Sequence, residues 1–150
     1  MALLLRFPRA TAFVEIKRNS LRRFGAEAFV DRVVRDLHLA PQRCVPISFA
    51  AEALARARTA GAQRVGWVIE EYSAAVRRAA EALAPQFLFC DYELLPRRGA
   101  PWPGPWEWVV YTVNDPELLP GLAARGVRLI ETDAIGEMLG CIRAEGRDGR

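Results

Sequence analysis

The chain has 150 residues, of which 51% are apolar, so it is long and apolar enough to form one hydrophobic core and does not have the composition of a disordered segment. Its 21 Lys and Arg residues against 18 Asp and Glu residues leave a formal charge of +3, which is too small and too dispersed for a nucleic-acid-binding protein. No stretch approaches the roughly 18 apolar residues of a membrane span, and the opening apolar run is shorter than a signal-peptide core of about 7–15 residues. These features predict a soluble cytoplasmic domain.

Apolar patterning predicts six short strands, most of them followed by an amphipathic helix. The expected strands are Thr11–Ile16, Cys44–Ser48, Arg64–Ile69, Gln86–Cys90, Trp106–Thr112 and Val127–Glu131. The expected helices are Leu21–Leu39, Phe49–Ala60, Ser73–Leu83, Pro116–Arg125 and Asp133–Cys141, with Ser20, Asp115 and Asp133 as N-caps. This alternation predicts one α/β domain with a parallel sheet. The proline- and glycine-rich segment 91–105 interrupts it and is expected to be a loop, which is where binding loops often occur.

Cysteine and histidine usage limits the chemistry that the chain can perform. Cys44, Cys90 and Cys141 are odd in number and lack a C-x-x-C pair, so we expect reduced thiols in the core rather than disulfides or a zinc site. His38 is the only histidine, and no serine lies in a nucleophile-elbow context. A Ser-His or Cys-His catalytic site is therefore not expected.

The residues that end the predicted strands are the candidates for function, because parallel sheets bind ligands at the carboxyl ends of their strands. Glu15 and Lys17 are two residues apart and share one face of the first strand, while Val14 and Ile16 share the other. We expect both charged side chains to point into the mouth of a barrel, as a metal ligand and a phosphate partner. A purely structural ion pair is the alternative. The other strand ends carry Ser48, Glu70 with Glu71, Asp91, Tyr111 with Thr112 and Asn114, and Glu131 with Thr132 and Asp133; Glu70 and Glu71 are also consistent with simple solvation.

Four strand segments follow one another in the order of a known set of motifs. They read T-A-F-V-E-I-K at 11–17, V-P-I-S-F at 45–49, V-Y-T-V-N-D at 110–115 and L-I-E-T-D at 129–133. These segments resemble the (V/N)-x-E-I-K, Ser-Phe, W-T-V-N and I-x-T-D strands of the glycerophosphodiester phosphodiesterase family, with Tyr111 in place of the commoner tryptophan. The resemblance covers the chain from about Thr11 to Leu139.

The resemblance implies a (β/α)8 TIM barrel and a phosphoric diester hydrolase of lipid metabolism, which converts glycerophosphodiesters to an alcohol and glycerol 3-phosphate. It also implies a divalent cation, Mg²⁺ or Ca²⁺, held by three carboxylates, and two histidines as general acid and base. Glu15 matches the third metal carboxylate, Lys17 a basic residue that meets the phosphate, and Tyr111 an aromatic residue lining the substrate pocket. The cation would polarise the phosphodiester and help to activate a nucleophile, and Lys17 would offset charge on the phosphate oxygens.

The chain departs from the family at its amino-terminal side. The family's His-Arg-Gly start, its Glu-x-Asp metal pair and its His-Asp motif precede the E-I-K strand, and none of them matches the fourteen residues before Glu15. His38 follows that strand and matches neither family histidine. Barrels of this type have about 250 residues. We therefore expect residues 1–150 to form a single partial domain, an incomplete barrel of six parallel strands and about five helices that lacks the first two βα units.

Two alternatives to the interpretation as a glycerophosphodiester phosphodiesterase stay open. The chain alone is expected to be inactive because it holds none of the family histidines, so it could be a non-catalytic barrel fragment or a scaffold that a partner completes. Its open barrel edges would allow self-association. A sphingomyelinase D-like phosphodiesterase on the same barrel is the second alternative. The expected ligand is a small molecule of the glycerophosphodiester type, and no nucleic-acid partner is expected.

Overall fold

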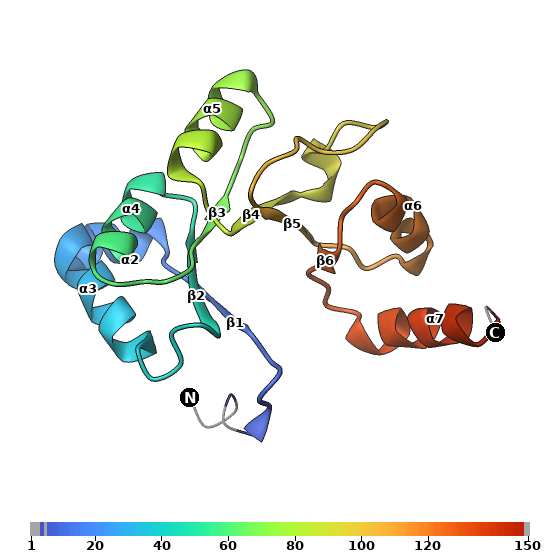
Figure 1. The fold of residues 1–150 in the computed structure, drawn as a ribbon, viewed down its shortest axis with the longest axis horizontal. Coiled ribbons are helices and arrows are strands. Elements are labelled where there is room, and N and C mark those ends of the chain that lie inside the picture. Colours follow the sequence, from blue (N-terminus) through green and yellow to red (C-terminus); the bar gives the residue numbers. More distant parts are fainter. Residues whose placement is uncertain (1–3, 5, 149–150) are drawn as a thin grey trace.

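A computed structural model describes residue 4 and residues 6–148 of the chain (Figure 1). Its strands form one six-stranded sheet in which each strand pairs with the next along the chain, and all five pairs are parallel. The strands are β1 (Ala12–Glu15), β2 (Cys44–Ser48), β3 (Gly66–Val68), β4 (Phe87–Asp91), β5 (Glu107–Tyr111) and β6 (Leu129–Ile130). Each overlaps a predicted run, so the parallel α/β architecture is confirmed.

Six α-helices are found in the described part of the chain, with two short 3-10 helices. The α-helices are α2 (Arg18–Phe24), α3 (Ala26–Leu37), α4 (Ala51–Thr59), α5 (Ala74–Leu83), α6 (Leu119–Ala124) and α7 (Ile135–Asp148); the 3-10 helices are η1 (Tyr92–Leu94) and η2 (Pro116–Leu118). The last helix continues well beyond its predicted end at Cys141. In Figure 1 the helices lie around the outside of the curved sheet.

The first predicted helix is wrong in its bounds, because the structure has two helices where one was expected. Gly25 has a φ of 81°, a conformation that glycine adopts at no steric cost, and it ends α2 and precedes α3. Ser20 accordingly lies inside α2 and is not an N-cap. Asp115 does cap the helical segment after it, since its carboxylate accepts the Glu117 N–H at 2.9 Å.

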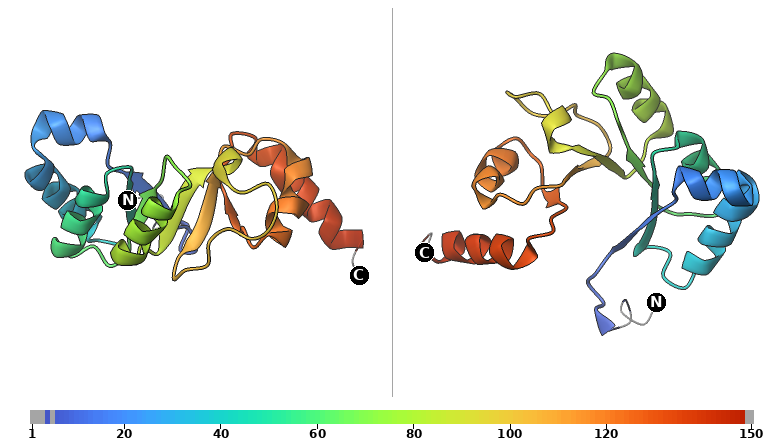
Figure 2. Two further views of the ribbon diagram at one scale, coloured as in Figure 1. Left: turned by 90° about the horizontal axis from the view of Figure 1, so that it is seen from above. Right: turned by 180° about the vertical axis from the view of Figure 1, so that it is seen from behind.

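The sheet is strongly curled, which makes it an open arc of a barrel (Figure 2). Phe13 of β1 contacts Phe87 and Phe89 of β4 edge to face, with ring centroids 4.9 and 5.2 Å apart. Three strand spacings of roughly 4.8 Å separate β1 from β4 along a flat sheet. Contact across that separation requires a concave inner face, so the predicted incomplete barrel is confirmed.

Alternating residues of the strands fill two separate apolar layers. Phe87 and Phe89 belong to the inner layer on the concave face, while Leu88 and Cys90 belong to the larger core between the sheet and the helices. Cys90 is fully buried, and burial beside Asp91 raises the pKa of its thiol to about 12, so the thiol stays protonated. Cys44 is buried as well, and Cys141 is half-buried.

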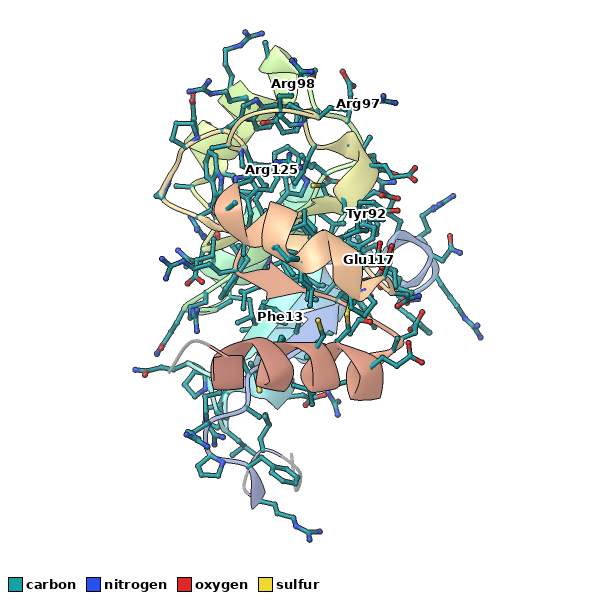
Figure 3. All side chains as sticks on the ribbon, turned by 90° about the vertical axis from the view of Figure 1, so that its right-hand side faces the viewer. Phe13, Tyr92, Arg97, Arg98, Glu117 and Arg125 are labelled. Carbon is teal, nitrogen blue, oxygen red and sulfur yellow. The ribbon has the colours of Figure 1, made fainter. Side chains whose placement is uncertain are left out.

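The connection between β4 and β5 has no α-helix, as its prolines and glycines predict. After η1 the chain runs back irregularly, and the Trp102 ring stacks on Tyr72 with centroids 3.8 Å apart. The Trp108 indole N–H donates to the Trp102 carbonyl at 3.0 Å. Arg125 at the end of α6 holds the same loop, since its guanidinium donates to the carbonyls of Pro96 and Gly99 at 2.6 and 3.0 Å (Figure 3). Aromatic packing thus takes the place of a helix on the outside of the sheet.

Among the described residues, no helix combines the length and the apolar character that crossing a membrane requires.

Candidate functional site

The candidate site lies at the mouth, by which we mean the concave face at the carboxyl ends of the strands. Glu15 is the last residue of β1 and is paired in register with Ile47, whose side chain packs against the concave layer. Phe13, two residues earlier, points into the same layer. Ile16 is buried in the core on the helix side. The side chains of β1 are therefore divided between the two faces as their period of two predicts.

Glu15 and Lys17 lie close together at this end of β1. The Lys17 ammonium is 3.7 Å from the Glu15 carboxylate, and the two side chains are 70% and 36% exposed respectively. Exposed ion pairs of this kind contribute only about 0–1 kcal/mol, so a ligand can displace one partner at small cost. The proximity matches the expectation from their spacing, while the metal and phosphate roles stay predictions.

Tyr111 ends β5 and packs against the concave layer. Burial is the main reason that the pKa of its phenol is raised to about 12, and the nearby Cys90, Asp91, Glu131 and Glu70 add to the shift. At neutral pH the phenol keeps its proton and can donate a hydrogen bond. Tyr111 sits three strands away from β2 and four from β1 in the sheet order. The described structure shows no contact between Tyr111 and the Glu15–Lys17 pair.

The described residues do not by themselves fit a divalent cation. Hard cations of this kind need several oxygen ligands, and no group of three or more His, Cys, Asp or Glu side chains suited to a metal occurs in the described part of the chain. Asp91, one of the carboxylates nearest Tyr111, already accepts the Glu93 N–H at 2.9 Å. Glu15 could therefore supply one ligand but not a complete site.

His38 lies away from the mouth. It follows α3 and lines a cavity of about 580 Å³ that also contacts Arg35 and Arg56 of helices α3 and α4. This cavity is on the helix side of β2, whose Cys44 borders it. His38 therefore lies on the helix side of the sheet and not at the carboxyl ends of the strands.

Arg18 is the site residue that sequence reasoning missed, and its partner is Glu70, one of the predicted strand-end candidates. The Arg18 guanidinium donates to both oxygens of Glu70 at 2.9 and 2.6 Å and to the Phe49 carbonyl at 3.2 Å. It also lies over the Phe49 ring, 5.5 Å from its centroid. This hydrogen bonding raises the pKa of Arg18 and lowers that of Glu70. Glu70 is thus engaged rather than simply solvated, and the only sequence signal was that both residues follow strand ends.

Two of the family-like segments, 110–115 and 129–133, are joined by hydrogen bonds beside β6. The Asn114 amide oxygen accepts the Thr132 hydroxyl at 3.0 Å and the Asp133 N–H at 2.9 Å. The Thr132 hydroxyl accepts the Ala134 N–H at 2.9 Å, while the described hydrogen bonds include none from the Asp133 carboxylate to the first turn of α7 (Ile135–Asp148). The predicted Asp133 cap is therefore corrected. The bonds join the chain after β5 to the chain after β6, which gives Asn114 and Thr132 a structural role at the mouth.

Comparison with known proteins places this arc within a recognised barrel fold. No family pattern matches the sequence, and no curated protein matches it either. Several solved structures match the fold, and three of them are compared with the chain below. A glycerophosphodiester phosphodiesterase from Parabacteroides distasonis aligns with 91% of this chain at a TM-score of 0.70 and 19% identity. A protein assigned as a glycerophosphoryl diester phosphodiesterase from Silicibacter pomeroyi aligns with 91% at 0.68 and 19% identity. An Oleispira antarctica phosphodiesterase, solved with the product sn-glycerol-3-phosphate, aligns with 78% at 0.60 and 16% identity.

These structures show that the chain has the fold of glycerophosphodiester phosphodiesterases along most of its length. The alignments cover 58%, 51% and 51% of the Parabacteroides, Silicibacter and Oleispira chains, so this chain spans little more than half the length of its structural relatives.

Proposed function

We propose that the chain is the carboxy-terminal part of a phosphodiesterase that hydrolyses glycerophosphodiesters to an alcohol and glycerol 3-phosphate. The observation that carries the proposal is the position of Glu15 and Lys17, close together at a strand end of a fold shared with phosphodiesterases. Barrel enzymes build their sites from residues at this end of the strands.

The proposal includes two further βα units that complete the barrel. Two observations support it. The alignment covers 58% of the Parabacteroides chain, and β1 and β6 are the outer strands of the sheet in the described part. Two more strands between β6 and β1 would bring the count to the eight of a closed barrel. The remaining site residues would come from those units.

Within this site the residues of the chain have distinct roles. Lys17, with its exposed ammonium, would stabilise the negative charge that grows on the phosphate oxygens during displacement. Tyr111 would form part of the pocket wall and donate a hydrogen bond from a phenol that stays neutral because of its raised pKa. Glu15 would be one carboxylate of a Mg²⁺ or Ca²⁺ site whose other ligands lie outside the described residues. The residues that the structure describes provide no complete ligand set of their own.

The test begins with the coding sequence upstream of Met1. We expect an in-frame segment with a His-Arg motif and a Glu-x-Asp motif, and we expect the longer protein to release glycerol 3-phosphate from glycerophosphocholine in the presence of Mg²⁺ or Ca²⁺. In that protein Glu15→Gln should abolish turnover, whereas Glu71→Gln, an exposed strand-end carboxylate of the same size, should leave it unchanged. A longer protein that hydrolyses the substrate equally well with Glu15→Gln would refute the role of Glu15. A protein without turnover would favour the scaffold alternative.

A further inference from the structure

A hollow lies on one side of the mouth, and Lys17 is the one residue of its lining that has a role in the proposed function. It has a volume of about 280 Å³ and is lined by Lys17, Arg18, Asn19, Arg22, Phe49 and Glu70. Lys17, Phe49 and Glu70 lie within two residues of the ends of β1, β2 and β3, and the other three residues belong to α2. Pockets for drug-sized ligands begin at roughly 300 Å³, so this hollow suits a small head group rather than a whole lipid.

The charges around the hollow favour an anion. Three cationic side chains face one carboxylate, and that carboxylate is already bound at both oxygens by Arg18. Lys17 lies on the side of Glu15, 3.7 Å from its carboxylate. Arg22 has no acidic partner among the described contacts. The hollow therefore keeps a net positive charge after its ion pairs are formed.

Both arginines are held in place by neighbouring groups. Glu70 and the Phe49 carbonyl orient the Arg18 guanidinium, and the Asn19 amide oxygen accepts an N–H of Arg22 at 3.1 Å. A guanidinium has five N–H donors, and the observed bonds occupy only some of them. The donors that are left match the paired oxygens of a phosphate group, which arginine binds in a bidentate manner.

We propose that this hollow binds a phosphate monoester group, with Arg18 and Arg22 as its ligands. The binding of an anion does not depend on the proposed function, but the identification of that anion with a part of the substrate or product rests on it. If the chain belongs to a glycerophosphodiester phosphodiesterase, the group is either a phosphate carried by the alcohol part of the substrate or the phosphate of the product. In the first case, Arg18 and Arg22 are specificity residues that favour substrates with a phosphorylated alcohol over the zwitterionic glycerophosphocholine.

The test is a calorimetric titration of the 150-residue protein with inorganic phosphate at about 0.15 M salt, where long-range charge effects are screened. We expect saturable binding that Arg22→Gln weakens roughly ten- to hundredfold, the range for a lost hydrogen bond to a charged group. Arg23→Gln is the matched control, because Arg23 has the same charge in the same helix but lies over Phe24, 5.2 Å from the ring centroid, and does not line the hollow. It should change the affinity less than twofold.

Two results would overturn the proposal. One is the lack of saturable phosphate binding by the wild-type protein, and the other is an equal loss of affinity in the Arg22 and Arg23 variants, which would mean attraction by overall charge alone. Arg18→Gln should weaken binding as Arg22→Gln does. If circular dichroism shows that Arg18→Gln disturbs folding, Arg22→Gln decides, since the one side-chain hydrogen bond of Arg22 within the described structure is that to Asn19.

Competition experiments separate the sources of the phosphate group. If sn-glycerol 3-phosphate displaces inorganic phosphate and the diester does not, the hollow is assigned to the product. If a glycerophosphodiester with a phosphorylated alcohol displaces it, the hollow is assigned to the substrate. Glycerophosphocholine carries no phosphate monoester and should not displace inorganic phosphate. Phosphate binding that depends on Arg22, together with a longer protein that lacks diesterase activity, would support the anion site and refute the proposed function. Diesterase activity of the longer protein without phosphate binding at the hollow would support the proposed function and refute the anion site.

Discussion

Gly66 of β3 lies where the concave layer has no room for a side chain. A Cβ atom at this position would be 2.8 Å from Cε2 of Phe89 and 2.9 Å from Cγ2 of Ile47. Both neighbours are confined within the inner apolar layer. The inner layer therefore has space for a hydrogen atom at this position but not for a methyl group.

We predict that Gly66→Ala lowers the free energy of unfolding by about 1–3 kcal/mol, the usual cost of overpacking a core. Urea denaturation measures the change. Gly136→Ala is the control, because a Cβ there meets nothing within 4 Å and alanine favours the helix by up to about 1 kcal/mol. Equal stability of the two variants would contradict the tight packing at β3.

Ser48 is the buried polar side chain that connects the first two strands. Its side chain is 0% exposed, its hydroxyl donates to the Ile16 carbonyl at 2.7 Å, and its oxygen accepts the Ala50 N–H at 3.1 Å. Ile16 directly precedes Lys17. Ser48 therefore helps to hold the backbone that positions the Glu15–Lys17 pair, although the residue itself faces the core on the helix side.

Ser48→Ala is expected to destabilise the protein by about 1–3 kcal/mol, since it leaves buried backbone groups without a partner. Thermal or urea unfolding gives this number. Ser20→Ala serves for comparison, because Ser20 lies inside α2 and caps no helix. A loss of about 1 kcal/mol for Ser20→Ala would point instead to the cap that the sequence predicts.

Helices α3 and α4 are joined by an ion pair between Asp31 and Arg56. The Arg56 Nε donates to Asp31 Oδ1 at 2.7 Å, and its Nη2 donates to the second carboxylate oxygen. This bidentate contact holds the pKa of Asp31 below its ordinary value, as Arg18 does for Glu70. Both carboxylates are therefore more acidic in the folded protein than in the unfolded chain.

The sign of the resulting pH dependence follows from these lowered pKa values. A carboxylate with a lowered pKa contributes stability above its unfolded pKa, about 4, and loses it as the pH falls through its folded pKa. We predict that the urea midpoint is steady near neutral pH and falls below about pH 4. In Asp31→Asn the fall should be shallower. Asp36→Asn removes a pair within a single helix turn and should keep the wild-type slope, and a steeper fall in Asp31→Asn would disprove the assignment.

Strand β1 presents one side of its backbone to a further strand. The N–H groups of Ala12 and Ile16 donate to β2-side carbonyls, at 2.7 Å each, and N–H groups alternate in direction along a strand. Those of Phe13 and Glu15 therefore point away from β2. Within the described residues β1 has no second strand neighbour. Unpaired edges of this kind favour pairing with another chain.

We predict that the amides of Phe13 and Glu15 exchange with deuterium faster than those of Val14 and Ile16. Pairing at this edge, whether by self-association or by the completing βα units, should slow the first two amides selectively. Hydrogen exchange read by NMR at low and high protein concentration tests self-association, and sedimentation velocity gives the size of the species. Unchanged exchange in a sample that does associate would place the contact elsewhere.

At the scale of the whole molecule, the expected outcome is that the 150-residue chain alone hydrolyses glycerophosphocholine negligibly. The described residues hold neither a complete set of metal ligands nor a histidine at the mouth. General acid–base catalysis alone accounts for about 10²–10⁴ in rate. Release of glycerol 3-phosphate with Mg²⁺ or Ca²⁺ is the measurement. Turnover that Glu15→Ala abolishes would show that the chain contains a working site, with Asp91 or Glu131 as a further carboxylate.

The order and type of the strands could be predicted from the sequence because they depend on local patterns. The period of two along Phe13, Glu15 and Lys17 is enough to place three side chains on one face, whatever lies around them. The alternation of strands and helices predicts parallel pairing for the same reason. Gly25 was the local exception, since a glycine within an amphipathic pattern is compatible with either a continuous helix or a break.

Only the tertiary structure decided which distant groups meet. Arg18 and Glu70 are 52 residues apart and become neighbours because β1, β2 and β3 end side by side, with Phe49 between them. The curl that brings Phe13 onto Phe87 depends on the packing of six strands together, and the stacking of Trp102 on Tyr72 replaces a helix that a regular barrel would have there. Local periodicity determines the face on which a side chain lies. The partner that it finds there depends on how the sheet curves and on which strands are adjacent, and these are properties of the whole fold.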